Sequence, residues 1–296
     1  MDLSVIIVNW KVKDLLRRNL ASVYANTSGI DFEVFVVDNA SGDGSVEMVA
    51  REFPQATLIA NNRNLGFAAG NNPALRLATG DFLVLLNPDA EPVGNALAEM
   101  VAYMRANPRV AIAGPRIINE DGSTQPSVRR FPTPLSQILV MLKVQNLAPN
   151  LGPLRRYYAL DFDYAKAAPV DQVMGAAFFI RREVLDRIGL MDERFFIWYE
   201  EVDWCKRAKD AGLEVWYAPV AKVRHGGGQS FRQVFGPQKQ RMMNRSLRYY
   251  MKKHFGLAAW AVVSVLHPLS MALAWLAPAI KNLVPRYDPF RQRRLP

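Results

Sequence analysis

The sequence predicts an α/β fold in which helices flank a mostly parallel central sheet. Residues 3–115 alternate short apolar runs with longer helical stretches, which is the pattern of parallel strands joined by helices. Half of the 296 residues are hydrophobic, enough to fill a sizeable core. Polar residues gather where the apolar runs end, as they do at the ligand-binding edge of such a sheet.

The expected elements follow in order along the chain. Strands are expected at Leu3–Val8, Glu33–Val37, Thr57–Ile59 and Phe82–Leu86, and helices at about Lys13–Tyr24 and Ser45–Glu52, with a third entered through Leu65–Gly70. Residues 116–170 are rich in proline and arginine without a clear period, which indicates a variable region or a lid. Beyond them we expect a strand at Val173–Ile180, a short helix at Arg182–Ile188, and extended chain at Val215–Tyr217 and Lys222–Arg224.

The strand ends predict a nucleotide site. Ligands of open α/β sheets bind beyond the carboxyl ends of the strands, so the polar residues there share one crevice. Asp38 follows the run VFVV, where it can accept a hydrogen bond from a base N–H or a ribose hydroxyl. A capped turn that includes Asn39 and Ser41 also explains it. A dinucleotide cofactor is disfavoured, because the first turn, NWKVKD, lacks the glycine-rich fingerprint.

Two residues are predicted to hold a divalent cation. Asp89 ends the segment LLNPDA as a hard oxygen ligand, with Asn87 beside it, although Asn-Pro and Pro-Asp pairs are also ordinary turn residues. His225 follows an extended segment and precedes three glycines, which let the backbone approach a phosphate. A packed imidazole is the alternative for His225, and it is the preferred interpretation of His254 and His267.

The segment WYEEVDW gives the strongest indication of chemistry. It holds Glu200, Glu201 and Asp203 between aromatic side chains, where burial and like charge raise a carboxyl pKa and favour a general base. An acidic helix start is the alternative, because carboxylates are favoured near a helix N-terminus and a helix closed by Gly212 follows. Cys205, the single cysteine, has no partner for an intramolecular disulfide and is interpreted as packing.

These segments together resemble a known family. SVIIVNW, VVDNASGDGS, NLGFAAGNN, LLNPDA and the stretch from MGAAFFIRREV to KVRHGGGQS are similar, in this order, to the inverting family 2 glycosyltransferases of the GT-A fold. The similarity is greatest to their rhamnosyltransferase-like branch and covers about residues 3–255. It implies a Rossmann-like nucleotide half, an acceptor half, and inverting transfer of a sugar from a nucleoside diphosphate to a hydroxyl, with Mg or Mn.

The resemblance also implies roles for individual residues. His225 would complete a metal site with Asp89, and Glu201 falls on the position of the catalytic base. The family more often has Asp at that position, which leaves Glu200 and Asp203 as alternative bases. The nucleotide and donor site would comprise Val8, Asn9, Asp38, Asn39, Asn64, Gly66, Asn71, Asn87 and Asp89. Asn87 replaces the first acid of the commoner metal motif, which bears on the strength of metal binding.

The resemblance favours dTDP-rhamnose as donor and a lipid-linked saccharide or a polysaccharide as acceptor, in cell-surface glycan synthesis. Arg129 and Arg130 could reach a diphosphate of the donor or acceptor; surface arginines of a proline-rich loop are the preferred alternative. A sugar-1-phosphate nucleotidyltransferase would need a glycine-rich loop after its first strand, and that loop is absent. A non-catalytic membrane-bound adaptor is a third hypothesis, opposed by the ordered acids Asp38, Asp89 and Glu201.

The C-terminal part is basic and apolar. The formal net charge is +10, and residues 222–296 alone carry +13. Leu257–Ile280 contains no charged residue, but Pro268 divides it into halves that are each too short to span a bilayer. A basic amphipathic helix is expected just before it, with cations at Arg241, Arg245, Arg248 and Lys252.

We therefore expect three parts: a nucleotide-sugar half at 1–115, an acceptor and catalytic half at 116–235, and a helical extension at 236–296. The extension is expected to lie in the interface of an anionic membrane, or to enter it as a shallow hairpin. This predicts a peripheral or monotopic protein on the cytoplasmic face of the inner or plasma membrane. A helical pair packed on the protein, or in a homodimer, is the alternative. Nucleic acid is not an expected partner, because no binding motif accompanies the charge.

Overall fold

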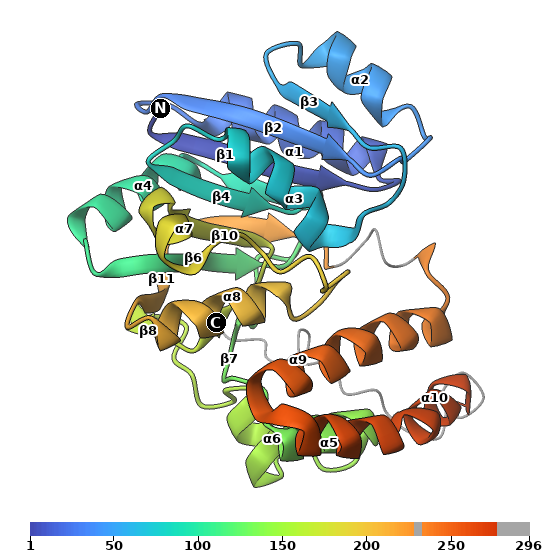
Figure 1. The fold of residues 1–296 in the computed structure, drawn as a ribbon. Coiled ribbons are helices and arrows are strands. Elements are labelled where there is room, and N and C mark those ends of the chain that lie inside the picture. The colour runs from blue at the N-terminus through green and yellow to red at the C-terminus, as the bar shows by residue number, and fades with distance from the viewer. Residues whose placement is uncertain (228–232, 277–296) are drawn as a thin grey trace.

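The first part of the chain forms the predicted parallel sheet in the computed structural model, which describes residues 1–227 and 233–276 (Figure 1). Its elements are β1 (Leu3–Asn9), α1 (Lys13–Asn26), β2 (Phe32–Asp38), α2 (Ser45–Glu52), β3 (Thr57–Ala60), α3 (Gly66–Leu77) and β4 (Phe82–Leu86). The pairs β3–β2, β2–β1 and β1–β4 are all parallel. The expected strands and helices of this part are confirmed.

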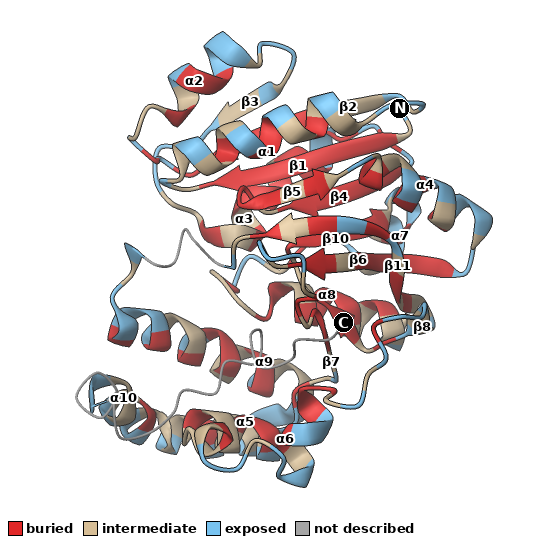
Figure 2. Ribbon diagram, turned by 180° about the vertical axis from the view of Figure 1, so that it is seen from behind, coloured by how far each residue is buried: buried red, intermediate tan, exposed pale blue. Residues whose placement is uncertain are grey.

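Side chains of β1 explain why this sheet is covered on both faces. Every residue of β1 is buried, as its continuous apolar run predicts. Val5 and Ile7 belong to a core shared with α1 and with α4 (Ala96–Ala106), whereas Ile6 and Val8 belong to a core shared with α3. Figure 2 shows α1 and α4 on one side of these buried strands. The helices cover the faces of the sheet, and the carboxyl ends of the strands lie at its edge.

The second part of the sheet is mixed, so the prediction of a mostly parallel sheet holds only for the first part. The strand order is β3-β2-β1-β4-β10-β6-β11-β5, and β8 pairs with β11. β10 runs antiparallel to both of its neighbours, and β11 runs parallel to β6 but antiparallel to β5. The added strands are β5 (Ala90–Val93), β6 (Val110–Ile118), β8 (Ala168–Pro169), β10 (Ala177–Arg181) and β11 (Glu214–His225).

The expected strand at Val173–Ile180 is two strands. β9 (Gln172–Val173) pairs with β7 (Val128–Arg129) in a small second sheet, and β10 begins after a break at residues 174–176. The expected extended segments around 215 and 224 are parts of β11, which is irregular between Tyr217 and Lys222. α7 (Arg182–Ile188) and α8 (Glu200–Asp210) form where helices were expected. The predicted boundary at residue 115 lies inside β6.

A helical lobe lies beside the sheet (Figure 1). We define the helical lobe as residues 131–160 and 235–276. Its helices are α5 (Pro134–Met141), η1 (Val144–Asn146), α6 (Gly152–Tyr157), α9 (Gly236–Val265) and α10 (His267–Leu276). Thr133 caps α5 through a hydrogen bond from the backbone N–H of Ser136, at 3.2 Å. Buried side chains of α9 pack against α5 and against the segment that precedes α8.

Gly256 divides α9 into two halves. Its φ of +80° breaks the helix, and the second half folds back along the first. Arg248 Nε donates to Ser264 Oγ at 2.9 Å, and Asn244 Nδ2 donates to Ser270 Oγ at 3.2 Å, which fixes this hairpin. Among the described residues, no single helix has the length and apolar composition to cross a membrane; α9 and α10, bent by 42°, meet those limits only as a pair. Residues 277–280 of the predicted apolar run lie outside the described residues.

Candidate active site

Asp38 is held by its own turn at the end of β2. Its Oδ1 accepts from Asn9 Nδ2 at 2.8 Å and from Ser41 Oγ at 2.6 Å, and its Oδ2 accepts from the Ser41 backbone N–H at 2.9 Å. Asp38 is only 2% exposed. The capped turn, given above as the alternative for Asp38, is therefore present. Asn9 Oδ1 is buried and has no hydrogen-bond partner among the described residues, so a donor group of a ligand could reach it.

Asn39 and Gly66 connect this edge to the segment 61–66 before and at the start of α3, called the donor loop below because the predicted donor-site residues Asn64 and Gly66 lie in it. Asn39 Nδ2 donates to Gly66 O at 2.9 Å, and Asn64 Oδ1 accepts from the Gly66 N–H at 2.9 Å. Gly66 has a φ of +83°, and a Cβ there would lie 2.1 Å from Phe196 O. The adjacent Phe67 N–H donates to the same oxygen at 2.8 Å. The donor loop thus touches the chain just before the acidic segment, a contact that only glycine allows.

α3 also clamps the segment that leads to α8. Asn71, a predicted donor-site residue, is buried and donates from Nδ2 to Phe67 O inside its own helix at 2.9 Å. Asn72, which the sequence analysis did not single out, donates to Met191 O at 2.9 Å and accepts from the Met191 N–H at 3.2 Å. Two adjacent asparagines, Asn71 and Asn72, in a largely apolar helix could have indicated from the sequence that this position makes a structural contact. Through these two hydrogen bonds, Asn72 holds the backbone at Met191 in the segment before α8.

Asp89 and His225 lie together at the end of β4 and β11, as predicted. His225 Nε2 is 3.4 Å from Asp89 Oδ1 and 3.4 Å from Asn87 Nδ2. The backbone links them too, because the Gly226 N–H donates to Asp89 O at 3.0 Å. Both side chains are more than nine-tenths buried. The strand pairing His225↔Ala90 explains how residues 136 positions apart come into contact.

Gln125 orients the imidazole of His225. Gln125 Oε1 lies 2.7 Å from His225 Nδ1, so Nδ1 carries the proton and Nε2 presents its lone pair toward Asp89. Metal-binding histidines are commonly held in this way. Two ligands at about 2.1 Å from an octahedral ion lie roughly 3 Å apart, close to the observed Asp89–His225 separation. The separation of the pair therefore fits two ligands of one divalent cation. The described residues contain no cluster of three or more His, Cys, Asp or Glu suited to a metal.

The acidic segment starts α8 after an unusual turn. Trp198 and Tyr199 both have left-handed backbones, with φ of 60° and 72°. Such a conformation is strained for bulky residues, so the surroundings must hold it. Tyr199 Oη donates to Gln137 Oε1 at 2.8 Å, and Ser246 Oγ donates to Ile197 O at 2.7 Å. The acidic helix start, given above as the alternative for this segment, is present, and the hydrogen bonds with α5 and α9 fix it.

Glu200 and Glu201 are buried carboxyls without complete hydrogen bonding. Each has an Oε2 that is buried and has no hydrogen-bond partner among the described residues. Burial raises the pKa of Glu200 well above its usual range, and the charge of Glu201 adds to this. Burial also raises the pKa of Glu201, but the nearby Arg129 guanidinium opposes that increase. Of the two, Glu200 therefore keeps its proton more readily.

Asp203 has a different environment. It is fully buried and accepts from Lys253 at 2.7 Å, His254 at 2.8 Å and Arg207 at 2.9 Å. Burial opposes ionisation, but the hydrogen bonds from His254 and Lys253 outweigh it and lower the pKa of Asp203. Lys253 also contacts Asp192 at 2.8 Å. Asp203 thus ties α8 to α9. Cys205, also on α8, is fully buried, in agreement with its interpretation as packing.

The two predicted arginines have different positions. Arg129 on β7 lies over the rings of Tyr157 and Tyr158, with its guanidinium carbon 5.8 and 5.4 Å from the ring centroids, and its charge acts on Glu201. Arg130 is about half exposed and lies 3.9 Å from Asp171. The surface alternative therefore applies to Arg130, whereas Arg129 belongs to the surroundings of Glu201.

A short backbone strip joins the acidic helix to the Asp89–His225 pair. A Cβ on Gly175 would lie 3.7 Å from Glu201 Cγ, so this glycine lies directly against the carboxyl-bearing side chain. The next residue, Ala176, accepts from the Asn87 N–H at 2.9 Å. Glu201 and the segment 87–89 thus both contact residues 175–176.

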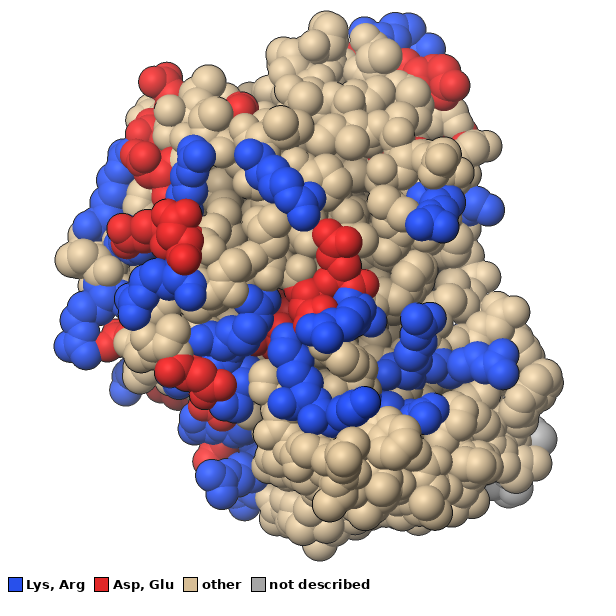
Figure 3. Space-filling view, in the orientation of Figure 1, with Lys and Arg blue, Asp and Glu red and all other residues tan. Residues whose placement is uncertain are grey.

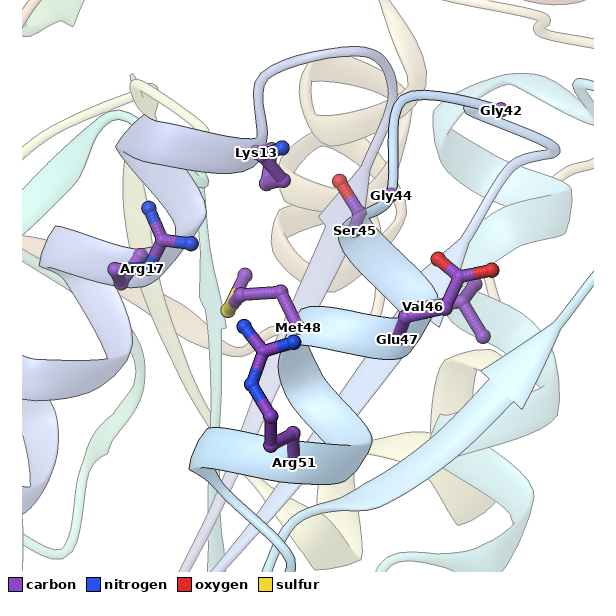
Figure 4. Close-up of a pocket in the computed structure, with 9 residues that line it drawn as sticks. All are labelled: Lys13, Arg17, Gly42, Gly44, Ser45, Val46, Glu47, Met48 and Arg51. Carbon is purple, nitrogen blue, oxygen red and sulfur yellow. The ribbon is translucent and has the colours of Figure 1, made fainter.

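A separate hollow lies between α1 and α2 (Figure 4). It has a volume of about 420 Å³ and is lined by residues of the turn before α2 and by cations of both helices. Arg17 and Arg51 on its wall both pair with Glu52. None of its lining residues is among the predicted site residues.

Comparison with known proteins decides the family. The model of the family described as Glycosyl transferase family 2 matches residues 4–189. The chain belongs to glycosyltransferase family 2. Relatives named as rhamnosyltransferases place this family 2 chain in the rhamnosyltransferase-like branch. The nucleotidyltransferase alternative is set aside by this membership. The family match includes Asp38 and Asp89 but ends before α8, so the position of Glu201 is known from the structure.

Two curated relatives show how far the similarity extends. The chain is 28% identical over 228 residues to the low-salt glycan biosynthesis hexosyltransferase Agl10 of Haloferax volcanii, which covers 76% of this chain and 67% of that protein. It is 26% identical over 236 residues to the N-acetylglucosaminyl-diphospho-decaprenol L-rhamnosyltransferase of Mycobacterium tuberculosis, which covers 75% of each.

A solved structure shows the same fold. The mannosyltransferase PcManGT from Pyrobaculum calidifontis, in complex with GDP-Man and Mn²⁺, matches with a TM-score of 0.55 at 21% identity. The match covers 97% of this chain and 76% of that one. The family 2 chain therefore has a GT-A-like α/β fold with a mixed central sheet and flanking helices.

Proposed function

We propose that this glycosyltransferase moves rhamnose from dTDP-rhamnose, with inversion, to a hydroxyl of a lipid-linked saccharide or a polysaccharide in cell-surface glycan synthesis. The observation that carries the proposal is that Glu201 and the segment that holds Asp89, which itself contacts His225, both contact residues 175–176. The names of relatives support the substrates: one is a dTDP-rhamnosyl transferase, and another acts on N-acetylglucosaminyl-diphospho-decaprenol.

In the proposed reaction, Glu201 takes the proton of the acceptor hydroxyl. As the acceptor oxygen forms its bond to the anomeric carbon, the bond from that carbon to the diphosphate oxygen breaks on the opposite face. The proton stays on the Glu201 carboxyl, and the diphosphate leaves with the bonding electron pair. Arg129 favours the ionised carboxylate that this step needs, and Glu200 keeps its own proton. The Glu201 Oε2 is buried and has no hydrogen-bond partner in the part of the chain that the structure describes.

The strand ends bind and orient the donor in this proposal. Asn9 Oδ1, buried without a partner among the described residues, can accept from the N–H of a base. Gly66 keeps the donor loop against Phe196, which brings the donor close to the turn before α8. A divalent cation bound by Asp89 and His225 would supply positive charge to the leaving diphosphate.

A panel of nucleotide sugars tests the proposed function. Purified protein is supplied with one of dTDP-rhamnose, UDP-N-acetylglucosamine and GDP-mannose, together with an N-acetylglucosaminyl-diphospho-polyprenol acceptor. We expect acceptor-dependent release of dTDP, loss of release when EDTA is added, and an anomeric configuration opposite to the donor's in the product NMR spectrum. Release from another donor alone would overturn the rhamnose assignment. No release from any donor, with folded protein, would overturn the role in transfer to this acceptor.

Gln125 provides a test of the metal pair that leaves both ligands in place. Gln125→Leu removes the partner of His225 Nδ1, so the imidazole loses its orientation. Loss of such an outer hydrogen bond costs about 10- to 100-fold in metal affinity. We expect the Mn²⁺ concentration that gives half-maximal activity to rise by that factor, with kcat recovered at saturating Mn²⁺. An unchanged Mn²⁺ titration would place the cation away from His225.

A further inference from the structure

The helical lobe differs from the rest of the protein in charge. Residues 131–160 and 235–276 contain nine Lys or Arg and no Asp or Glu. Figure 3 shows Lys and Arg in a band along the border of a largely uncharged surface in the lower part of the molecule, where the lobe lies. Of the four cations of the predicted basic helical face, Arg241, Arg245 and Lys252 are exposed, whereas Arg248 is half-buried and donates to Ser264.

The same lobe also carries most of the exposed apolar surface. Fourteen large hydrophobic side chains are exposed among the described residues, and eleven of them belong to the lobe. Single exposed apolar residues are ordinary, but such a concentration marks an interaction surface. The second half of α9 and α10 contribute Leu257, Val262, Val265, Leu269, Trp275 and Leu276.

We propose that the helical lobe docks on the surface of an anionic lipid bilayer, with the second half of α9 and α10 in the interface. The apolar side chains would enter the acyl-chain region of such a bilayer, and the exposed cations beside them would contact its negatively charged headgroups. A second copy of this chain would bring cations against cations, because the lobe has no acid to pair with them. A nucleic acid would satisfy the cations but leave the apolar side chains in water.

Docking through this lobe has a consequence for the active site. Ser246 on α9 holds the backbone of Ile197, and Lys253 on α9 holds Asp203 on α8. The lobe that meets the bilayer therefore also fixes the turn before the Glu201 helix. An acceptor anchored in the bilayer would approach the site beside the element that positions the base.

Vesicle sedimentation tests the proposal with the full chain. Vesicles of phosphatidylglycerol and phosphatidylethanolamine are compared with vesicles of phosphatidylcholine alone. Val265→Glu/Leu269→Glu puts two carboxylates on exposed apolar positions that are 78% and 49% accessible. The matched control, Leu77→Glu/Val220→Glu, changes the same residue types at exposed positions outside the lobe, 57% and 46% accessible. Circular dichroism melting checks that both variants fold.

We expect the wild type and the control to sediment with anionic vesicles, and the lobe variant to bind roughly tenfold more weakly or not at all. Arg241→Glu/Arg245→Glu is expected to weaken binding to anionic vesicles to the level seen with phosphatidylcholine. Equal binding by the lobe variant and the wild type would overturn the proposal. So would light scattering that shows a wild-type dimer and a monomeric lobe variant without any vesicle binding, because the surface would then join two copies. These outcomes do not depend on sugar transfer.

Discussion

Replacing Glu201 by Gln is expected to lower kcat by about a hundredfold to ten-thousandfold, the range that general-base assistance supplies. The amide has nearly the same shape but cannot take the acceptor proton. Donor affinity should stay within a few-fold, because the contacts proposed for the nucleotide lie on other elements. Transfer rates and isothermal titration with the nucleoside diphosphate measure the two effects separately.

Glu200→Gln is the matched control for Glu201→Gln. Burial and the charge of Glu201 keep Glu200 protonated, and an amide resembles a neutral carboxyl. Transfer by Glu200→Gln should therefore remain close to that of the wild type. The reverse result, an active Glu201→Gln and an inactive Glu200→Gln, would move the base to the neighbouring residue.

The pH dependence follows from the same environment. A base works in its ionised form, and burial raises the pKa of Glu201 above its ordinary value of 4.5. Activity should therefore rise with pH through a midpoint above 4.5, and the acid limb should be absent from the residual rate of Glu201→Gln. A wild-type acid limb at or below the ordinary value would contradict a buried base.

Replacing Asp203 by Asn is expected to destabilise the protein by about 3–5 kcal/mol, the typical cost of removing one member of a buried ion pair. Lys253, His254 and Arg207 would face a neutral amide in a site that excludes water. Urea unfolding of the purified variant measures the loss. The stabilisation by Asp203 also depends on pH. Because folding lowers the pKa of Asp203, this carboxylate stabilises the folded protein above the ordinary pKa of 3.8, and the stabilisation is lost as the pH falls through the folded-state pKa.

Asp210→Asn is the control for Asp203→Asn on the same helix. Asp210 pairs with Lys206 on the surface and is 55% exposed, so its loss should cost less than about 1 kcal/mol. Asp203→Asn should keep substantial activity at temperatures where it is folded. If it were fully stable yet inactive, Asp203 would have a direct part in the chemistry, as the sequence left open.

The first part of the fold could be predicted because its signals are local. Each parallel strand is a short apolar run, and the polar residues after Val8, Val37 and Leu86 mark one edge of the sheet. The direction of β10 could not be predicted. Between β6 and β10 the chain passes through β7, α5, α6, β8 and β9, so no single crossover helix joins the two strands and fixes the direction of β10.

The site shows the same limit. Glu200, Glu201 and Asp203 are equivalent in the sequence, and only Lys253 and His254, about fifty residues later, separate Asp203 from the other two. The contact between Asp89 and His225 was predicted from family resemblance and residue type. Gln125, which orients His225, lies in a segment without any recognisable motif. The environment of each side chain depends on residues far away in the sequence, and a single sequence does not show which distant residues come into contact.

The left-handed turn at Trp198 and Tyr199 can be stabilised only late in the synthesis of the chain. The strands that form the nucleotide edge are complete within the first ninety residues, whereas the turn depends on Ser246 and Lys253, which leave the ribosome much later. A nascent chain therefore acquires the nucleotide edge well before it can hold the base in place. Until α9 has emerged, the hydrogen bond from Ser246 to Ile197 and the ion pair of Lys253 with Asp203 cannot form.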